Sequence, residues 1–210
     1  MGERRESKKR ETRERISDVA TAMFFTRGFE AVTLEEIATA AKVSKMTVLN
    51  YFARKEELML DREDDLLMLP FREALRRRPK GEAPIDALRG VIDAMREQSH
   101  PFAYITRQAI DWWRVISASP SLKARLRELS DEAAEGLAIE LGGPTPDGLS
   151  RLMASVIVAT VRTAREEALR VLEHGGSAKK ANATLLALID RGFTAVEEMT
   201  PRSTSTSPRR

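Results

Sequence analysis

Two short apolar segments, each preceded by a residue suited to capping a helix, lie between residues 33 and 52. Thr33 can accept a hydrogen bond from a backbone N–H of the first segment, and Glu36 can bond back to the N–H of Thr33, which is the capping-box pattern. Ser44 is placed to cap the second segment in the same way. Two short helices joined by so tight a turn predict a helix-turn-helix. A turn of this length between amphipathic helices is also common in all-α proteins in general, so the pattern alone leaves DNA binding open.

Helical spacing of apolar residues continues through most of the chain. Aromatic residues make up 5% of the sequence, and few stretches alternate between apolar and polar residues as a strand would. We therefore predict an all-α fold. Helices are expected at about residues 11–26, 34–41, 44–52, 56–78, 84–98, 102–117, 121–141, 147–173 and 178–199, the fourth of them kinked at Pro70.

Composition excludes several classes of protein. The chain has no cysteine, so disulfide bonds and thiolate metal sites are excluded. No apolar run approaches the roughly 20 residues of a membrane helix. Residues 1–15 are charged and lack the apolar core of a secretory signal. We expect a cytoplasmic protein with no membrane partner and no bound metal.

Basic charge is concentrated around the second helix of the motif. Residues 42–55 carry four basic side chains and no acidic one, in a chain whose net charge is only +3. Short polar side chains and a lysine suit the base edges of the major groove of DNA, and Met and Thr methyl groups can contact a thymine methyl. The side chains expected to point outward are Ser44, Lys45, Met46, Thr47 and Asn50.

A longer pattern surrounds this motif. It consists of GFEAVTLEEIA at residues 28–38, VSKMTV at 43–48, YF at 51–52 and KEEL at 55–58. Together these stretches resemble the TetR family of bacterial regulators over about residues 10–60. The segment SPSLKARL at 119–126 resembles a common C-terminal pattern of the same family.

The resemblance implies a homodimer whose two recognition helices bind a palindromic operator in double-stranded DNA. It also implies release of the operator when a small-molecule effector enters the C-terminal domain. In this family the residues matching Thr33 and Lys55 typically contact phosphates, and the third helix reads bases. The full predicted DNA-contacting set is Thr33, Ser44, Lys45, Met46, Thr47, Asn50, Tyr51 and Lys55.

Two positions depart from the family pattern. Lys42 stands where glycine is frequent, and a positive φ there would cost a non-glycine residue about 1 kcal/mol. Leu49 stands where a phosphate-contacting tyrosine is frequent, so Tyr51 or Lys45 would have to supply that contact. These departures affect individual contacts and leave the predicted fold unchanged.

The sequence is expected to divide into four parts. Residues 1–10 form a basic arm, disordered without a partner. Residues 11–57 form the three-helix DNA-binding domain, and residues 58–199 form the helical ligand-binding and dimerisation domain. Residues 200–210, rich in Ser, Thr, Pro and Arg, form a disordered tail.

A dimer interface is predicted on the last two long helices. Residues 152–161 are apolar or small nearly all round, which a helix needs only when it is buried on two sides. One side would meet the protein's own core and the other a partner subunit, giving a four-helix interface with two-fold symmetry. The predicted interface residues are Met153, Val156, Val161, Leu185, Ile189 and Phe193.

An apolar effector pocket is predicted among the helices between about residues 66 and 163. Methionines adapt to irregular shapes, which suits a cavity that must accept a ligand. The effector is expected to be small and mostly apolar, and its binding to release a repressor from DNA. The predicted lining residues are Met68, Phe71, Met95, Phe102, Ile105, Trp113, Ile157 and Thr160.

Two other functions compete with a DNA-binding regulator. Against an all-α enzyme, the chain lacks a GxSxG elbow, a phosphate-cradling glycine loop, an HExxH pair and a cysteine nucleophile. We therefore predict no enzymatic activity and no cofactor. A helical interaction module that does not bind DNA stays open, and a sequence-specific DNA-binding assay separates it from a regulator.

Overall fold

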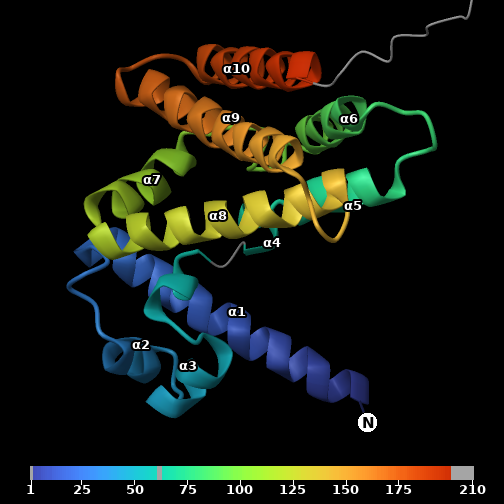
Figure 1. The fold of residues 1–210 in the computed structure, drawn as a ribbon. Helices are drawn as coiled ribbons and strands as arrows, with labels where there is room; N and C mark the ends of the chain where they lie inside the picture. The colour runs from blue at the N-terminus through green and yellow to red at the C-terminus, as the bar shows by residue number, and fades with distance from the viewer. Residues whose placement is uncertain (1, 61–62, 200–210) are drawn as a thin grey trace, which may run out of the picture. The chain divides into compact units, whose positions relative to one another are not determined.

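The computed structural model of the chain describes residues 2–60 and 63–199, and every regular element in these ranges is a helix (Figure 1). The prediction of an all-α fold is confirmed. In chain order the elements are α1 (Gly2–Arg27), α2 (Leu34–Ala40), α3 (Lys45–Tyr51), a short 3-10 helix η1 (Lys55–Leu58), α4 (Glu63–Leu66), α5 (Leu69–Arg77), α6 (Pro84–Glu97), α7 (Gln108–Ala118), α8 (Pro120–Gly142), α9 (Gly148–Glu173) and α10 (Ala178–Met199).

The chain packs as two compact units. The first comprises Met1–Leu67 and Thr106–Leu129, and the second comprises Met68–Ile105 and Ser130–Arg210. The sequence predicts that the DNA-binding domain ends at residue 57. In the packing, ten further residues and a later segment containing α7 belong with the helix-turn-helix.

The first unit is built around α1. Ile16, Ala20 and Phe24 follow helical spacing on one face of α1 and have no exposed surface. Leu58 joins the same core from the segment after α3, and Ile116 joins it from α7. The helix-turn-helix is therefore supported by apolar residues far from it in the sequence.

The N-terminal arm is helical, which corrects the expectation of disorder. Residues 2–10 are the first turns of α1. No proline or glycine interrupts the chain from Glu3 to Arg27. Side chains four residues apart also pair along it, since Ser7 Oγ donates to Glu11 at 3.0 Å and Arg10 lies 3.7 Å from Glu14.

The single kinked helix expected at residues 56–78 is also incorrect. The structure has η1, α4 and α5 as separate short helices within that span. Pro70 lies in the first turn of α5, where its missing N–H costs nothing, and a continuous helix would place its ring against the carbonyl of residue 66. The chain instead turns at Met68, whose φ is +54°.

The second unit is dominated by α9 and α10, which lie side by side (Figure 1). Both helices bury one apolar stripe, and α6 contacts α10. The buried residues of α9 include Met153, Ile157, Val161 and Leu172, and those of α10 include Leu185, Ile189, Phe193 and Val196.

Among the described residues, no helix combines the length and apolar character that crossing a membrane requires. The tail predicted at residues 200–210 lies outside the described residues.

Candidate nucleic-acid interface

The first helix of the predicted motif begins with the capping box. Thr33 Oγ1 accepts a hydrogen bond from the backbone N–H of Glu36 at 3.2 Å, and Glu36 Oε2 accepts from the backbone N–H of Thr33 at 2.8 Å. Arg27 at the end of α1 donates to the other carboxylate oxygen of Glu36 at 2.7 Å. The first two bonds cap α2, and the bond from Arg27 attaches the start of α2 to the end of α1.

The turn between α2 and α3 is tight, and one of its residues has a left-handed backbone conformation. Lys42 has a φ of +54°, so this position keeps a left-handed conformation although it is not a glycine. The N–H of Val43 donates to the carbonyl of Ala38 at 2.9 Å, and Ala38 itself is 4% exposed. A larger residue than alanine at position 38 would push the two helices apart.

The second helix has one buried residue and a broad outer face. Ser44 caps α3 by accepting from the N–H of Thr47 at 3.0 Å. Val48 is fully buried, whereas Met46 is 66% exposed. Lys45 and Asn50 are also exposed. The predicted outward set is therefore brought together on α3, with Thr47 and Tyr51 half-buried at its edges.

The C-terminal end of α3 is attached to α1. Arg13 donates from Nη1 to the carbonyl oxygen of Tyr51 at 2.8 Å. Its guanidinium lies 4.3 Å from the centroid of the Phe52 ring, and Phe52 is buried. A cation thus holds the last carbonyl of α3, where the helix dipole favours positive charge.

Much of the basic charge around α3 is already paired with carboxylates. Lys45 forms an ion pair with Glu35 on α2, and Arg54 lies 2.9 Å from Glu128. The hydrogen bond from Lys45 lowers the pKa of Glu35. Because these side chains are exposed, the pairs contribute little to stability.

Lys55, predicted to contact a phosphate, has an internal partner in this structure. Its ammonium Nζ donates to the backbone carbonyl of Phe29 at 2.5 Å. Sequence reasoning gave no sign of this contact, because Phe29 precedes Lys55 by 26 positions.

The predicted effector-binding residues are not all brought together. Trp113 belongs to the first unit and the other seven residues to the second. Thr160 lines a surface groove rather than the core. The remaining six are buried in the second unit, where the rings of Phe71 and Phe102 pack edge to face at 5.9 Å.

Most of the predicted dimer residues are buried inside the single chain. Leu185 and Phe193 have no exposed surface, and Val161 and Ile189 have almost none. Their side chains pack in the core of the second unit. Of the six predicted residues, Val156 is the one that also lines a surface groove.

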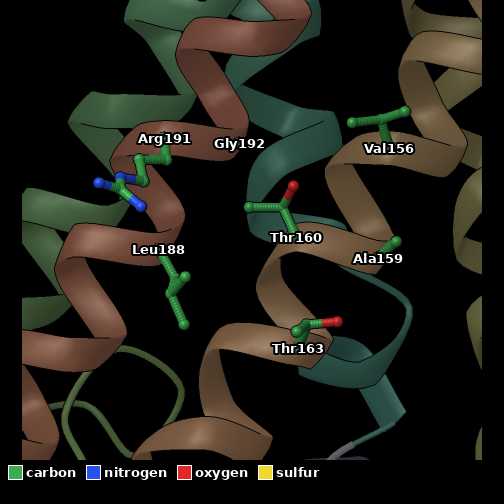
Figure 2. A pocket seen from close by; sticks show the side chains of 7 residues that line it. All are labelled: Val156, Ala159, Thr160, Thr163, Leu188, Arg191 and Gly192. Atoms are coloured by element: carbon green, nitrogen blue, oxygen red, sulfur yellow. The ribbon is translucent and has the colours of Figure 1, made fainter.

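That groove lies between α9 and α10 (Figure 2). It is open, has a volume of about 430 Å³ and is mostly apolar. Leu152, one turn before Val156 on α9, is 52% exposed. In the sequence, the helical spacing of these α9 residues was the signal that could indicate an apolar face on the surface of α9. The groove is lined by Val156, Ala159, Thr160, Thr163, Leu188, Arg191 and Gly192.

Within the described residues, no group of three or more histidine, aspartate and glutamate side chains is arranged to hold a metal ion.

The capped pair α2–α3, the left-handed turn and the exposed face of α3 define a helix-turn-helix protein of the DNA-binding type. Residues 16–61 match the family model described as "Bacterial regulatory proteins, tetR family". This match confirms the resemblance to the family that was noted in the sequence.

A curated transcriptional regulator is similar to part of the chain. The chain is 36% identical over 91 residues to the HTH-type transcriptional regulator TcmR of Streptomyces glaucescens, a match covering 43% of this chain. The match spans 40% of the length of that curated relative.

Solved structures share the fold over most of the chain. The SmeT–triclosan complex, SmeT being a Stenotrophomonas maltophilia repressor, has a TM-score of 0.57 and 21% identity, covering 95% of this chain and 99% of that one. NalD of Pseudomonas aeruginosa has a TM-score of 0.55 and 16% identity, covering 89% and 97%.

Proposed function

We propose that the chain regulates transcription by reading double-stranded DNA with α3. The observation that carries this proposal is the division of α3 into a single buried residue, Val48, and an outer face formed by Lys45, Met46 and Asn50. A helix held by its inner side and presenting such residues fits the major groove. The proposed contacts also include Thr33, Ser44, Thr47, Tyr51 and Lys55.

The experiment that tests this function selects binding sites from random duplexes with the purified full chain. The affinity for the selected duplex is then compared with that for a scrambled one at fixed salt. Asn50→Ala is expected to alter base preference and to weaken specific binding by about 1–3 kcal/mol. Gln98→Ala removes an exposed amide in the second unit and serves as the matched control. Enrichment of no sequence would refute the function.

The regulator is proposed to act as a homodimer through the exposed face of α9 and α10. Leu152, Val156 and Leu188 place apolar surface on this face, and an apolar face of this kind favours association. A two-fold pairing brings the same groove of both copies together. It also holds two α3 helices in fixed relation, which a palindromic operator with half-sites about 34–36 Å apart requires.

We further propose that a small, mostly apolar effector binds the second unit and releases the protein, as a repressor, from its operator in the cytoplasm. Support comes from the apolar residues that α5, α6, α9 and the segments before α5 and after α6 bury in that unit: Met68, Phe71, Met95, Phe102, Ile105 and Ile157. Such coupling requires the effector to bind the DNA-free form more tightly than the DNA-bound form.

The effector proposal is tested with compounds that raise the melting temperature of the free protein. A true effector must also weaken operator binding, and a reporter gene behind the operator must become more active when the effector is added. Compounds that stabilise the protein and leave operator affinity unchanged would contradict the proposed release. Lower reporter activity would contradict the repressor role.

A further inference from the structure

Two side chains of α3, Met46 and Asn50, point directly away from the buried side of the helix. An α-helix turns by about 100° per residue, so each of them lies about 160° from the buried Val48 and only about 40° from the other. Both are exposed, and Met46 is the most exposed large apolar side chain in the described part of the chain. When α3 lies in the major groove, these two side chains reach deepest toward the bases.

The other outward residues of α3 lie to the sides of this line. Lys45 lies about 60° from Val48 in one direction around the helix axis, and Thr47 lies about 100° from it in the other. Tyr51 is on the same side as Thr47, about 60° from Val48. A helix in the groove directs such flanking side chains toward the groove walls, where the phosphates are.

The polar groups on the flanks already have partners within the protein. Ser44 Oγ and Thr47 Oγ1 share a hydrogen bond at 2.8 Å, and Lys45 forms an ion pair with a carboxylate of α2. Within residues 2–60 and 63–199, no hydrogen bond or ion pair involves the side chain of Met46 or Asn50. A group that keeps an internal bond can still bind a phosphate, but a phosphate carries no sequence information. The two side chains without partners are therefore those best placed to read bases.

The chemistry of these two side chains selects particular bases. The carboxamide of Asn50 can accept a hydrogen bond from N6–H of adenine while donating one to N7, a pattern that adenine alone presents in the major groove. The thioether of Met46 is apolar and adapts its shape to its neighbours. In the major groove the C5 methyl of thymine is the apolar group available to it.

We propose that Met46 and Asn50 are the base-reading pair of α3, in which Asn50 reads an adenine and Met46 covers the C5 methyl of a thymine one or two base pairs away. The spacing follows from geometry, since Cβ atoms four residues apart on a helix are about 5–6 Å from each other and successive base pairs are about 3.4 Å apart. This inference rests on the proposed function and adds the chemistry of the bases that are recognised.

The test removes single groups from the DNA. A duplex selected from random sequences is remade with each thymine in turn replaced by deoxyuridine, which lacks only the C5 methyl. Each adenine in turn is replaced by 7-deazaadenine, which lacks the N7 acceptor. Affinities are measured at fixed salt for the wild type, Met46→Ala and Asn50→Ala. Phe25→Ala removes an exposed apolar side chain of α1 in the same unit and is the matched control.

For the wild type we expect one thymine in each half of the site whose replacement lowers affinity about fourfold, the effect of one buried methyl group. One or two base pairs from it, replacement of one adenine should lower affinity about tenfold. Met46→Ala should be insensitive to that deoxyuridine and still sensitive to the 7-deazaadenine, and Asn50→Ala should show the reverse. The variant and the modified base then remove the same contact, so their effects are not additive. Phe25→Ala should respond to both modified bases as the wild type does.

Three results would overturn the proposal. One is a wild type whose affinity depends on no thymine methyl. Another is a variant that stays as sensitive as the wild type to its own modified base, deoxyuridine for Met46→Ala or 7-deazaadenine for Asn50→Ala. The third is an equal loss of affinity for the selected and a scrambled duplex in Met46→Ala, which would show a non-specific contact. If the wild type selects no sequence at all, the proposed function itself fails, a result distinct from these three.

Discussion

Gly192 on α10 lies directly against the side chain of Thr160 on α9 (Figure 2). A Cβ atom at Gly192 would stand 2.2 Å from both Oγ1 and Cγ2 of Thr160, far inside contact distance. The two helices therefore meet at this point with no side chain from α10 between them. Because both residues also line the groove, the close approach shapes the proposed dimer face.

Gly192→Ala is expected to destabilise the protein by about 1–2 kcal/mol, because overpacking at a helix contact outweighs the higher helix propensity of alanine. The free energy of unfolding in urea measures this effect. Gly90→Ala is the matched control, since Gly90 is in helix α6 and a Cβ there would meet nothing within 4 Å. Equal stabilisation by both substitutions would contradict the prediction.

Val156→Glu is expected to convert the dimer to a monomer at micromolar concentration. A charge in the apolar groove would be buried opposite its symmetry mate, and like charges across an interface cost several kcal/mol. Sedimentation measures the mass, and circular dichroism must show intact helices. Ile139→Glu, at a partly exposed apolar residue on α8, controls for added charge and should leave the mass unchanged. A monomeric wild type would disprove the proposed interface.

Lys42→Gly is expected to raise the free energy of unfolding by up to about 1 kcal/mol. The φ of +54° at Lys42 strains any residue with a Cβ, and glycine removes that strain at some cost in the entropy of the unfolded chain. Lys42→Ala removes the charge and keeps the Cβ, so it should give no such gain. If alanine stabilises as much as glycine, charge rather than strain is responsible.

Glu36→Gln is expected to remove part of the acid sensitivity of the fold. The backbone N–H of Thr33, the side chain of Arg27 and the hydroxyl of Thr33 lower the pKa of Glu36 from 4.5 to about 2. A folded-state pKa below the unfolded one stabilises the protein above about pH 4.5, and this contribution disappears as pH falls toward 2.

The melting temperatures of the wild type and Glu36→Gln should therefore differ most at neutral pH and converge as pH falls through this window. Asp131→Asn, at an exposed carboxylate on α8, is the control and should show no comparable convergence. A wild-type advantage that persists unchanged at pH 2 would contradict the assigned role of the carboxylate.

Some features of this protein could be predicted from the sequence, because the residues that form each of them lie within a few positions of each other. The cap at Thr33 and the cap at Ser44 are of this kind, and each appears where the pattern predicted it. The outward set on α3 follows from the same local geometry, since one buried Val48 determines which side faces out. Local bonds and helical spacing require no knowledge of the rest of the fold.

Local sequence patterns gave wrong predictions where one feature favours a helix and another opposes it. The spacing of apolar residues continues across residues 56–78, yet the chain breaks there because Pro70 excludes a continuous helix. The charged residues 2–10 were expected to be disordered, but paired side chains on successive turns favour helix.

Only the tertiary structure decided which apolar face of α9 and α10 is buried in the chain and which is exposed. A helix that is apolar nearly all round carries the same sequence signal on both sides, so Val161 and Val156 are alike until packing places one in the core and the other on the groove. The partner of Lys55 was equally hidden, because a lysine's position in a pattern does not reveal an acceptor 26 positions away. The sequence by itself therefore determined most of the helices, the caps and the helix-turn-helix, whose causes are local. The tertiary structure decided which side chains remain free to meet a partner, since that depends on packing between distant segments.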